Sequence, residues 1–406
     1  MTVAAAVLPV CSPQILGGFT LSVLLALIYL AFISLGLPDS LLGSAWPVMQ
    51  AELGVPISYA GIVTMIISGG TIVSSLLSDR LTRKLGAGLV TAASVLLTAV
   101  ALFGFSVTHS FWALCLWAIP YGLGAGAVDA ALNNFVALHY SSRHMSWLHC
   151  AWGVGAAISP YIMSYCLTGG YGWNNGYFSV SMIQVVLTAV LFASLPLWKQ
   201  KDSGKAGEEA GARALSLPQA LKIKGVPLVM VTFFAYCAME QTTGIWASSY
   251  LVQYRGIRTD MAASFGSFFF LGITVGRFLC GFIADRLGDK MLIRVGIFTA
   301  LTGVLLILLP VKTDIPALTG LLVIGFGSAP IYPSIIHSTP FHFGKENSQA
   351  IIGIQMASAY AGATFMPPLF GLLTSFLNIG LYPVYLLLFG ILMLVMSERL
   401  NRIAAQ

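Results

Sequence analysis

Long, nearly uninterrupted runs of apolar residues recur along this chain, separated by short polar or glycine-rich breaks. Most runs reach about 20 residues, the length that a helix needs to cross the hydrocarbon core of a bilayer. Only 8% of the 406 residues are charged, whereas roughly 25% are charged in a soluble domain. So few charges cannot build a water-facing surface, and lipid must therefore be the solvent for much of the chain.

The apolar runs predict an all-α membrane protein. Backbone polar groups within lipid must be satisfied internally, and the runs lack the alternating ten-residue strands of a transmembrane barrel. We expect twelve transmembrane helices in two pseudo-symmetric six-helix bundles. The expected helices lie near 16–45, 58–79, 86–107, 111–139, 144–168, 176–197, 227–253, 260–284, 290–311, 314–339, 347–376 and 379–398.

A polar stretch at 198–226 divides the chain near its middle and holds six of the twenty Lys and Arg residues. We therefore expect an N-terminal bundle over 1–197, a cytoplasmic linker over 198–226 and a C-terminal bundle over 227–406. Sixteen Lys and Arg residues fall in the end tails and in the loops after every second helix, against three in the opposite loops. The positive-inside rule then places both termini in the cytoplasm of a multi-pass inner-membrane protein.

The two halves share an internal repeat. GTIVSSLLSDRLTRKLG at 70–86 matches GRFLCGFIADRLGDK at 276–290, and Asp79 aligns with Asp285 at an offset of 206. At the same offset His149 falls on Gln355, within WLHCAWGVGAAISP (147–160) and GIQMASAYAGATFMPP (353–368). Two matches in the same order predict parallel repeats that rock around a central site.

The repeated segments also carry a family resemblance. GxxxDRxxRKxG at 75–86, with serine at the usual first glycine, and GxxxDRxGDK at 281–290 resemble the loop motif of the major facilitator superfamily. That resemblance implies that the acidic and basic residues of the motif lock the cytoplasmic side of one open state; the alternative is that these charges only fix topology. The gating residues implied here are Asp79, Arg80, Arg83, Asp285 and Arg286.

Three shorter segments resemble the fucose–galactose–glucose/proton symporter branch of that superfamily. They are GLPDSLLGSAWP at 36–47, AVDAALNNFVA at 127–137 and SAPIYPSIIH at 328–337. EQTTGIW at 240–246 is similar to a run of the sugar porters, from which Glu240 and Trp246 depart. The resemblance implies sugar transport, and those two departures put any particular sugar in doubt.

Ionisable residues inside membrane spans are costly and mark function by default. Asp39 follows Pro38 in the first expected helix, Asp129 lies in the fourth and Glu240 in the seventh. We expect Asp39, Asp129 or Glu240 to carry the coupling proton; the alternative for each is a buried structural carboxyl. Arg277, in the eighth helix, is expected to extend toward the cytoplasm and pair with Asp285 rather than to bind solute.

Further polar and aromatic side chains within the spans are candidates for binding solute. Asn133 lies one turn from Asp129 on the same face, and Trp152 lies in the same relation to His149. An amide beside an acid, and an imidazole beside an indole, both suit a polyhydroxylated ligand; the alternative is packing and interhelical hydrogen bonding. The predicted solute-binding residues are Asp39, Asn133, Asn134, His149, Trp152, Glu240, Gln241, Trp246, Tyr332 and Gln355.

The sequence lacks a GxxxxGK[ST] phosphate loop, so ATP is not the energy source, and it lacks the HExxH and nucleophile-elbow motifs of hydrolases. We expect no enzymatic activity, no cofactor and no metal, because the six cysteines are scattered. The net charge of +6 reflects basic loops and does not indicate nucleic acid. The expected partners are a small-molecule solute, protons and the lipid bilayer, and the protein is expected to be a monomer.

These observations predict a secondary active transporter that moves a small polar solute, with a sugar favoured, by alternating access coupled to protons. One rival is a proton-driven exporter of amphipathic drugs or lipids, which predicts a large apolar cavity with one or two acids. Another is a transceptor or a membrane protein that does not transport. An organic-anion carrier ranks lower, because it should bury more Arg or Lys.

Overall fold

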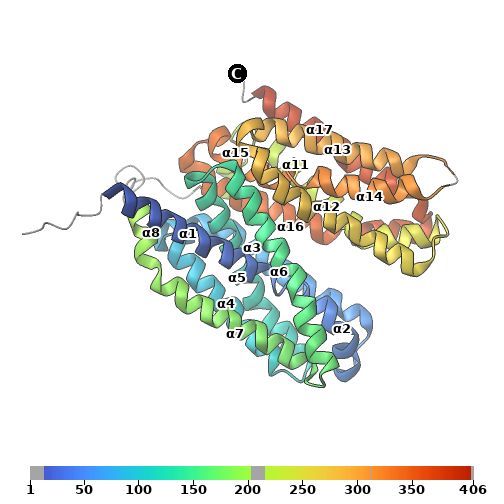
Figure 1. Ribbon diagram of the computed structural model, residues 1–406, viewed down its shortest axis with the longest axis horizontal. Coiled ribbons are helices and arrows are strands. Elements are labelled where there is room, and N and C mark those ends of the chain that lie inside the picture. Colours follow the sequence, from blue (N-terminus) through green and yellow to red (C-terminus); the bar gives the residue numbers. More distant parts are fainter. Residues whose placement is uncertain (1–12, 203–214, 312, 404–406) are drawn as a thin grey trace, which may run out of the picture.

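A computed structural model describes residues 13–202, 215–311 and 313–403, and all of its regular structure is helical. The helices of the first half and those of the second form two groups that meet near the middle of the molecule (Figure 1). The first group contains α1 (Pro13–Gly36), α2 (Leu41–Glu52), α3 (Ala60–Leu85), α4 (Ala87–Ser106), α5 (Phe111–His139), α6 (Ser142–Thr168), α7 (Gly172–Ala193) and α8 (Leu195–Asp202).

The second group begins after the short helix α10 (Leu217–Ala220). It contains α11 (Val226–Gln253), α12 (Thr259–Leu287), α13 (Asp289–Leu308), α14 (Ile315–Ser328), α15 (Ile331–Phe343), α16 (Lys345–Phe376) and α17 (Tyr382–Ile403). Two single turns of 3-10 helix, η1 (Ile57–Tyr59) and η2 (Ile379–Leu381), precede α3 and α17. Helix follows helix in each group, so the expectation of an all-α protein is confirmed.

Ten stretches of the described residues are long and apolar enough to cross a membrane. The long helices α11 and α16 are not among the ten, although they run beside them (Figure 1). Both carry polar residues in mid-helix, such as Glu240 and Gln241 in α11 and Gln349 and Gln355 in α16. Those residues lower the mean hydropathy of α11 and α16, although both helices are long enough to span a membrane. The expected total of twelve transmembrane helices therefore stays a prediction.

Two of the expected helices are broken at proline. The first is divided into α1 and α2 at Leu37–Ser40, where Pro38 cannot donate a backbone hydrogen bond and Asp39 donates to Gly36 O over 3.3 Å. Residues 314–339, expected as one helix, are divided between α14 and α15 at Ala329 and Pro330. The break in the first helix leaves Asp39 in a turn rather than in a regular helix.

Very short turns join the helices at one end of both groups. A single glycine with positive φ joins α3 to α4 (Gly86, 79°), α12 to α13 (Gly288, 74°) and α15 to α16 (Gly344, 84°). Glycine fits because other residues rarely adopt this backbone conformation. We call this the basic end, because it also carries Arg83 and Arg143; the other end of the molecule is the opposite end.

Large apolar side chains cover the outer faces of both groups. Leu116 is 64% exposed, Val186 66%, Phe298 57% and Leu388 61%, and many others are similar. Soluble monomers rarely expose apolar surface on this scale. A bilayer around these faces would keep the apolar side chains out of water, as expected for a membrane protein.

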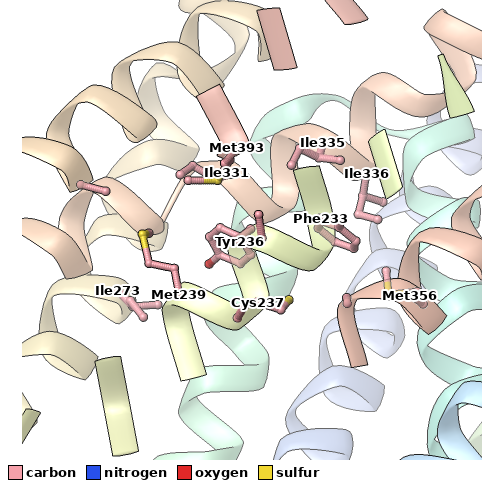
Figure 2. Packing of buried hydrophobic residues seen from close by; sticks show 14 of the residues in the cluster. Phe233, Tyr236, Cys237, Met239, Ile273, Ile331, Ile335, Ile336, Met356 and Met393 are labelled. Carbon is pink, nitrogen blue, oxygen red and sulfur yellow. The ribbon is translucent and has the colours of Figure 1, made fainter. Parts of the chain in front are cut away.

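The second half packs around a buried layer of aromatic and aliphatic side chains (Figure 2). Phe233, Tyr236 and Met239 of α11 meet Ile273 of α12 and Ile331 of α15 there. The Tyr236 hydroxyl donates to Ser328 O over 3.1 Å, so its one polar atom is satisfied. This layer fixes α11 and α12 one turn from Glu240 and Arg277.

Candidate functional site

Asp129 lies where the two halves meet, and both of its carboxyl oxygens are hydrogen-bonded. Asn133 Nδ2, one turn along α5, donates to Oδ1 over 2.7 Å. Tyr360, on α16 of the second half, donates its hydroxyl to Oδ2 over 2.7 Å. Asp129 is only 4% exposed. This buried carboxyl is therefore shared directly between the halves.

His149 extends the same network. Its Nε2 lies 3.0 Å from Asn133 Oδ1, so His149 joins the predicted neighbours Asp129 and Asn133 in one chain of contacts. The imidazole is buried between the rings of Phe32 on α1 and Tyr332 on α15, at centroid distances of 5.5 and 4.6 Å. The structure thus brings Tyr332 beside His149, although the Tyr332 hydroxyl donates to the Met356 sulfur.

Asp39 forms a second polar centre with Trp152. The indole Nε1 donates to Asp39 Oδ2 over 2.9 Å, and the Tyr121 hydroxyl donates to Oδ1 over 3.0 Å. Asp39 nevertheless stays exposed. The helices α1 and α6 come this close because they cross at Gly36 and Gly155, where a Cβ on either glycine would overlap a backbone carbonyl of the other helix.

Glu240 pairs with Arg277, which corrects the expected pairing of Arg277 with Asp285. Arg277 Nη2 lies 3.3 Å from Glu240 Oε1, and the two side chains are only 5% and 12% exposed. Arg277 does not extend to the basic end, because the Glu240 carboxylate lies at the same depth in the molecule as the guanidinium. Its guanidinium carbon lies 5.9 Å from the centroid of the Trp152 ring, across the junction of the halves.

Three predicted solute-binding residues lie in other surroundings. The Trp246 indole donates to Pro367 O over 3.0 Å and packs on Phe370, which ties α11 to α16. Gln355 is fully buried, and both ends of its amide contact Thr339 Oγ1, at 3.0 and 3.1 Å. Gln241 is half-buried on α11 next to Glu240, but consecutive residues point about 100° apart around a helix.

Asn134 lies on the junction of the halves, nearer the basic end than Asp129. Its Oδ1 accepts a hydrogen bond of 2.6 Å from Ser348 on α16. Close by, Gln349 Nε2 donates to Ser78 Oγ on α3 over 3.2 Å. Asn134 therefore belongs to the contact between α5 and α16, and not to the chain that joins Asp129 to His149.

The first gating motif contacts the second half through one arginine. Asp79 is buried and accepts from Arg83 Nε over 2.8 Å, which orients the guanidinium. Arg83 Nη2 then donates to Glu346 O at the start of α16 over 2.6 Å. Arg80, in the same motif, is exposed.

The second gating motif contacts the first half through its acid. Asp285 accepts from Arg143 Nε over 2.6 Å, from Arg143 N over 3.1 Å and from Ser141 Oγ over 3.2 Å. Arg286 is exposed. The two motifs therefore join opposite halves in a pseudo-symmetric way, α3 to α16 and α12 to α6.

A third contact at the basic end has no counterpart in the predicted set. His337 Nδ1 lies 2.6 Å from Asp289 Oδ2, and its Nε2 lies 3.1 Å from Tyr140 O in the first half. Asp289 Oδ1 in turn accepts from Ser142 Oγ over 2.6 Å. Among the described residues, hydrogen bonds between the halves thus run from the basic end to about the level of Asp129.

A hollow of about 510 Å³ lies apart from these polar groups, toward the opposite end of α6 and α7. It is open, and its most exposed lining side chains are Tyr161 and Tyr165, at 78% and 69%. Exposed tyrosines of this kind are typical of the boundary between membrane and water. The hollow shares no residue with the predicted site.

Sequence reasoning missed Tyr360, Tyr121 and Arg143. Arg143 was counted only as a topology signal, and the two tyrosines carry no charge inside the spans. Nothing in the local pattern around Tyr360 indicates that it would reach a carboxyl in the other half. In the part of the chain that the structure describes, no three His, Cys, Asp or Glu side chains are placed to hold a metal ion.

Comparisons with known proteins agree with this architecture. In sequence, the chain is 24% identical over 278 residues to "Bypass of stop codon protein 6" of Saccharomyces cerevisiae, a match that spans 63% of this chain and 56% of the yeast protein. It is 21% identical over 311 residues to the glucose/mannose transporter GlcP of Bacillus subtilis, covering 75% of this chain and 77% of that one.

The fold is similar to the crystal structure of FucP, a Major Facilitator Superfamily transporter, in the outward conformation. That likeness has a TM-score of 0.76 at 14% identity, and it covers 94% of this chain and 99% of that one. The family model of the Major Facilitator Superfamily matches residues 28–356 and 229–398. These matches cover both halves and the polar centres between them, and the chain belongs to the Major Facilitator Superfamily of membrane transporters.

Proposed function

We propose that the protein is a secondary active transporter that moves a small polar solute, with a sugar as the favoured class, by alternating access coupled to protons. The observation that carries the proposal is the Asp129 carboxyl, which is held by Asn133 of its own half and by Tyr360 of the other half. A proton carrier in such a transporter must respond to the movement of one half against the other, and Asp129 contacts both.

The hydrogen-bond inventory of Asp129 supports a link between proton and conformation. An ionised carboxylate only accepts hydrogen bonds, and the two bonds from Asn133 and Tyr360 suit that form. A protonated carboxyl must donate from one oxygen, so one of these bonds would have to reorganise. With the proton on Oδ2, the Tyr360 hydroxyl would have to change from donor to acceptor, so proton binding would alter the one of these two bonds that joins the halves.

The position of the contacts between the halves supports an outward-facing state. The bonds run from the basic end to about the level of Asp129 and include Arg83 to Glu346 O and Arg143 to Asp285. The excess of Lys and Arg in the loops at this end would place it, with both termini, in the cytoplasm of an inner-membrane protein. In this arrangement the solute would enter from the opposite end.

The chemistry of the polar centres supports a polyhydroxylated solute. Asp39 is exposed although Trp152 and Tyr121 donate to it, so its oxygens can still accept from hydroxyl groups. An indole beside a carboxylate can offer an apolar face to sugar C–H groups. A relative whose printed name is a glucose/mannose transporter agrees with this class of solute.

Counterflow in proteoliposomes tests the class of solute. Purified protein would be reconstituted with an excess of one unlabelled compound inside, and entry of labelled sugars, amino acids and lipophilic cations would be measured. We expect exchange of at least one sugar. Exchange of a lipophilic cation without any sugar would instead favour the rival, a proton-driven exporter of amphipathic drugs or lipids.

Two substitutions separate proton coupling from solute binding. Asp129→Asn and Asp39→Asn should each abolish proton-driven accumulation, because an amide cannot carry the proton, and at least one should keep counterflow. Ser179→Ala, on the outer part of α7, is a suitable control away from both centres. Normal accumulation in both acid variants would show that neither carboxyl is the proton carrier.

A further inference from the structure

The ion pair between Arg277 and Glu240 is not used by the mechanism proposed above. Arg277 is 4% exposed, and its guanidinium is held within the second half by Glu240 at 3.3 Å. Burying two charges is expensive even when they are paired. Because the pair is buried beside the candidate site, we searched its surroundings for a functional role.

The guanidinium is incompletely satisfied. Arginine has five N–H donors. Nη2 of Arg277 donates to Glu240 Oε1 over 3.3 Å, and the Tyr236 hydroxyl is a second, neutral side-chain hydrogen-bond partner. Its Nε is buried and has no acceptor among the described residues. Arginine commonly binds a carboxylate through two parallel N–H groups, and here the contact to Glu240 is single and long.

The surroundings connect Arg277 to the solute site. Its guanidinium lies 5.9 Å from the Trp152 ring centroid, and Trp152 donates to the exposed Asp39 carboxylate over 2.9 Å. Behind the pair, Ile273 and Tyr236 lie one turn earlier on α12 and α11 within the buried layer of Figure 2. The apolar layer fixes the two helices, while the Trp152 side of the guanidinium faces the other half.

Other ionisable groups around the pair do not supply a second counter-ion within hydrogen-bond distance. Those within electrostatic range of Arg277 or Glu240 are Tyr236 and Cys237 on α11, Cys280 on α12, Tyr332 on α15, and His149 and Cys150 on α6. Each of these is neutral in its ordinary buried form. Glu240 is therefore the resting counter-ion of Arg277.

We propose that Arg277 anchors a carboxylate on the solute and that Glu240 is the counter-ion which this carboxylate displaces. The inference rests on the proposed transport function and narrows its solute to polyhydroxylated carboxylic acids, that is, sugar acids. Asp39 and Trp152 would bind the hydroxyl-bearing part, and the fork formed by Nε and Nη2 would bind the carboxylate.

The charge balance gives Glu240 a defined part. At rest, Arg277 and Glu240 neutralise each other. When the solute carboxylate takes the place of Glu240, the released Glu240 carboxylate binds one proton, so that the site again holds one positive and one negative charge. No covalent bond is made or broken, and one proton enters the site with each solute carboxylate.

The test uses the full-length protein in proteoliposomes with labelled glucuronate and gluconate beside neutral glucose. We expect the wild type to exchange an acid at least tenfold faster than glucose. Arg277→Gln should lose acid exchange at least tenfold, and Arg277→Lys should lose most of it, because an ammonium keeps the charge but not the fork.

Glu240→Gln distinguishes an anchor from a structural ion pair. It should bind the acid more tightly than the wild type, since the competing carboxylate is gone, yet acid uptake should no longer be driven by a proton gradient. Arg294→Gln and Glu398→Gln, which break the pair between α13 and α17, are matched controls expected to leave both properties unchanged. Weaker acid binding in Glu240→Gln would overturn the proposal.

The possible results separate this inference from the proposed function. Exchange of glucose but of neither acid would overturn the role of Arg277 and leave the sugar transporter intact. Exchange of lipophilic cations alone would reject both. If Arg277→Gln does not fold, as judged by size-exclusion profile, Arg277→Lys and Glu240→Gln still decide the question.

Discussion

His149 Nε2 lies 3.0 Å from the amide oxygen of Asn133, sixteen positions earlier in the chain. The same contact recurs in the second half, where Gln355 and Thr339 are also sixteen positions apart and hydrogen-bonded at 3.0–3.1 Å. The repeat offset of 206 maps each member of the first pair onto the second. The two copies differ one turn earlier on the helix. Asp129 precedes Asn133 in the first half, whereas the position equivalent to Asp129, before Thr339 in the second half, is the apolar Ile335.

This difference predicts separate roles for the two copies. Gln355→Ala should lower stability by about 1–3 kcal/mol, since Thr339 would lose its buried partner, and should leave the apparent affinity for solute unchanged. His149→Ala should weaken solute exchange, because it removes the neighbour of Asn133 and Asp129. Thermal unfolding in detergent and the concentration dependence of counterflow measure the two effects. Weaker solute affinity in Gln355→Ala at unchanged stability would restore Gln355 to the solute site.

The hydroxyl of Tyr360 should control how easily the halves separate. Tyr360→Phe removes the 2.7 Å bond to Asp129 and leaves a buried carboxylate oxygen unpaired, at a cost of about 1–3 kcal/mol. Cys150 is a natural reporter, because its sulfur lies 3.9 Å from Thr274 O across the junction. In a variant whose only cysteine is Cys150, alkylation should become about tenfold faster, as 1.4 kcal/mol corresponds to a factor of ten.

Tyr385→Phe is the matched control for this experiment. Its hydroxyl donates to Met366 O within the second half, so its loss should not change the alkylation of Cys150. Equal rates in Tyr360→Phe and Tyr385→Phe would mean that the bond to Asp129 does not hold the halves together.

The contact between Asp285 and Arg143 should depend on the acid more than on the base. The Arg143 and Asp285 side chains are 46% and 29% exposed, and exposed pairs contribute only about 0.2–1 kcal/mol. Arg143→Gln should therefore speed Cys150 alkylation only slightly. Asp285→Ala also removes the acceptor of Arg143 N and Ser141 Oγ and should have the larger effect. Arg286→Gln should match the wild type; the reverse order of the first two variants would contradict the geometry.

Gly353 should limit how closely the halves approach. A Cβ at this position would overlap the backbone oxygen of Ser75 where α16 crosses α3. Gly353→Leu should force the helices apart, with an overpacking cost of about 1–3 kcal/mol, and should increase Cys150 alkylation. Gly61→Leu, on α3 with open space around its Cβ, is the control. Unchanged alkylation in both variants would show that α3 and α16 have room to adjust.

The sequence was sufficient for the parts of the structure that depend on local pattern. Apolar runs predicted the helices, and the spacing of Asp129 and Asn133 correctly placed them on one face. The repeat also paired His149 with Gln355. What could not be derived were contacts between helices far apart in sequence. Arg277 was expected to extend toward the cytoplasm and pair with Asp285, whereas its carboxylate partner is Glu240 on the neighbouring helix α11.

Tyr360 and Arg143 were missed for a related reason. Their partners, Asp129 and Asp285, lie in the other half of the chain. Periodicity gives the face of a helix on which a residue lies, and it does not give the partner that this face meets. The same limit applies to Asn134, which the spacing had left open between solute and a neighbouring helix.

The one-glycine turns at Gly86, Gly288 and Gly344 leave no slack between the helices that they join. The two helices joined by each turn must then move together as a rigid body. We therefore expect the largest displacements between the two halves, where the contacts are made by side chains. Two polypeptides, one ending and one beginning within 203–214, would therefore retain every such turn. Expressed together, they should reassemble into a working carrier without a covalent bond between them.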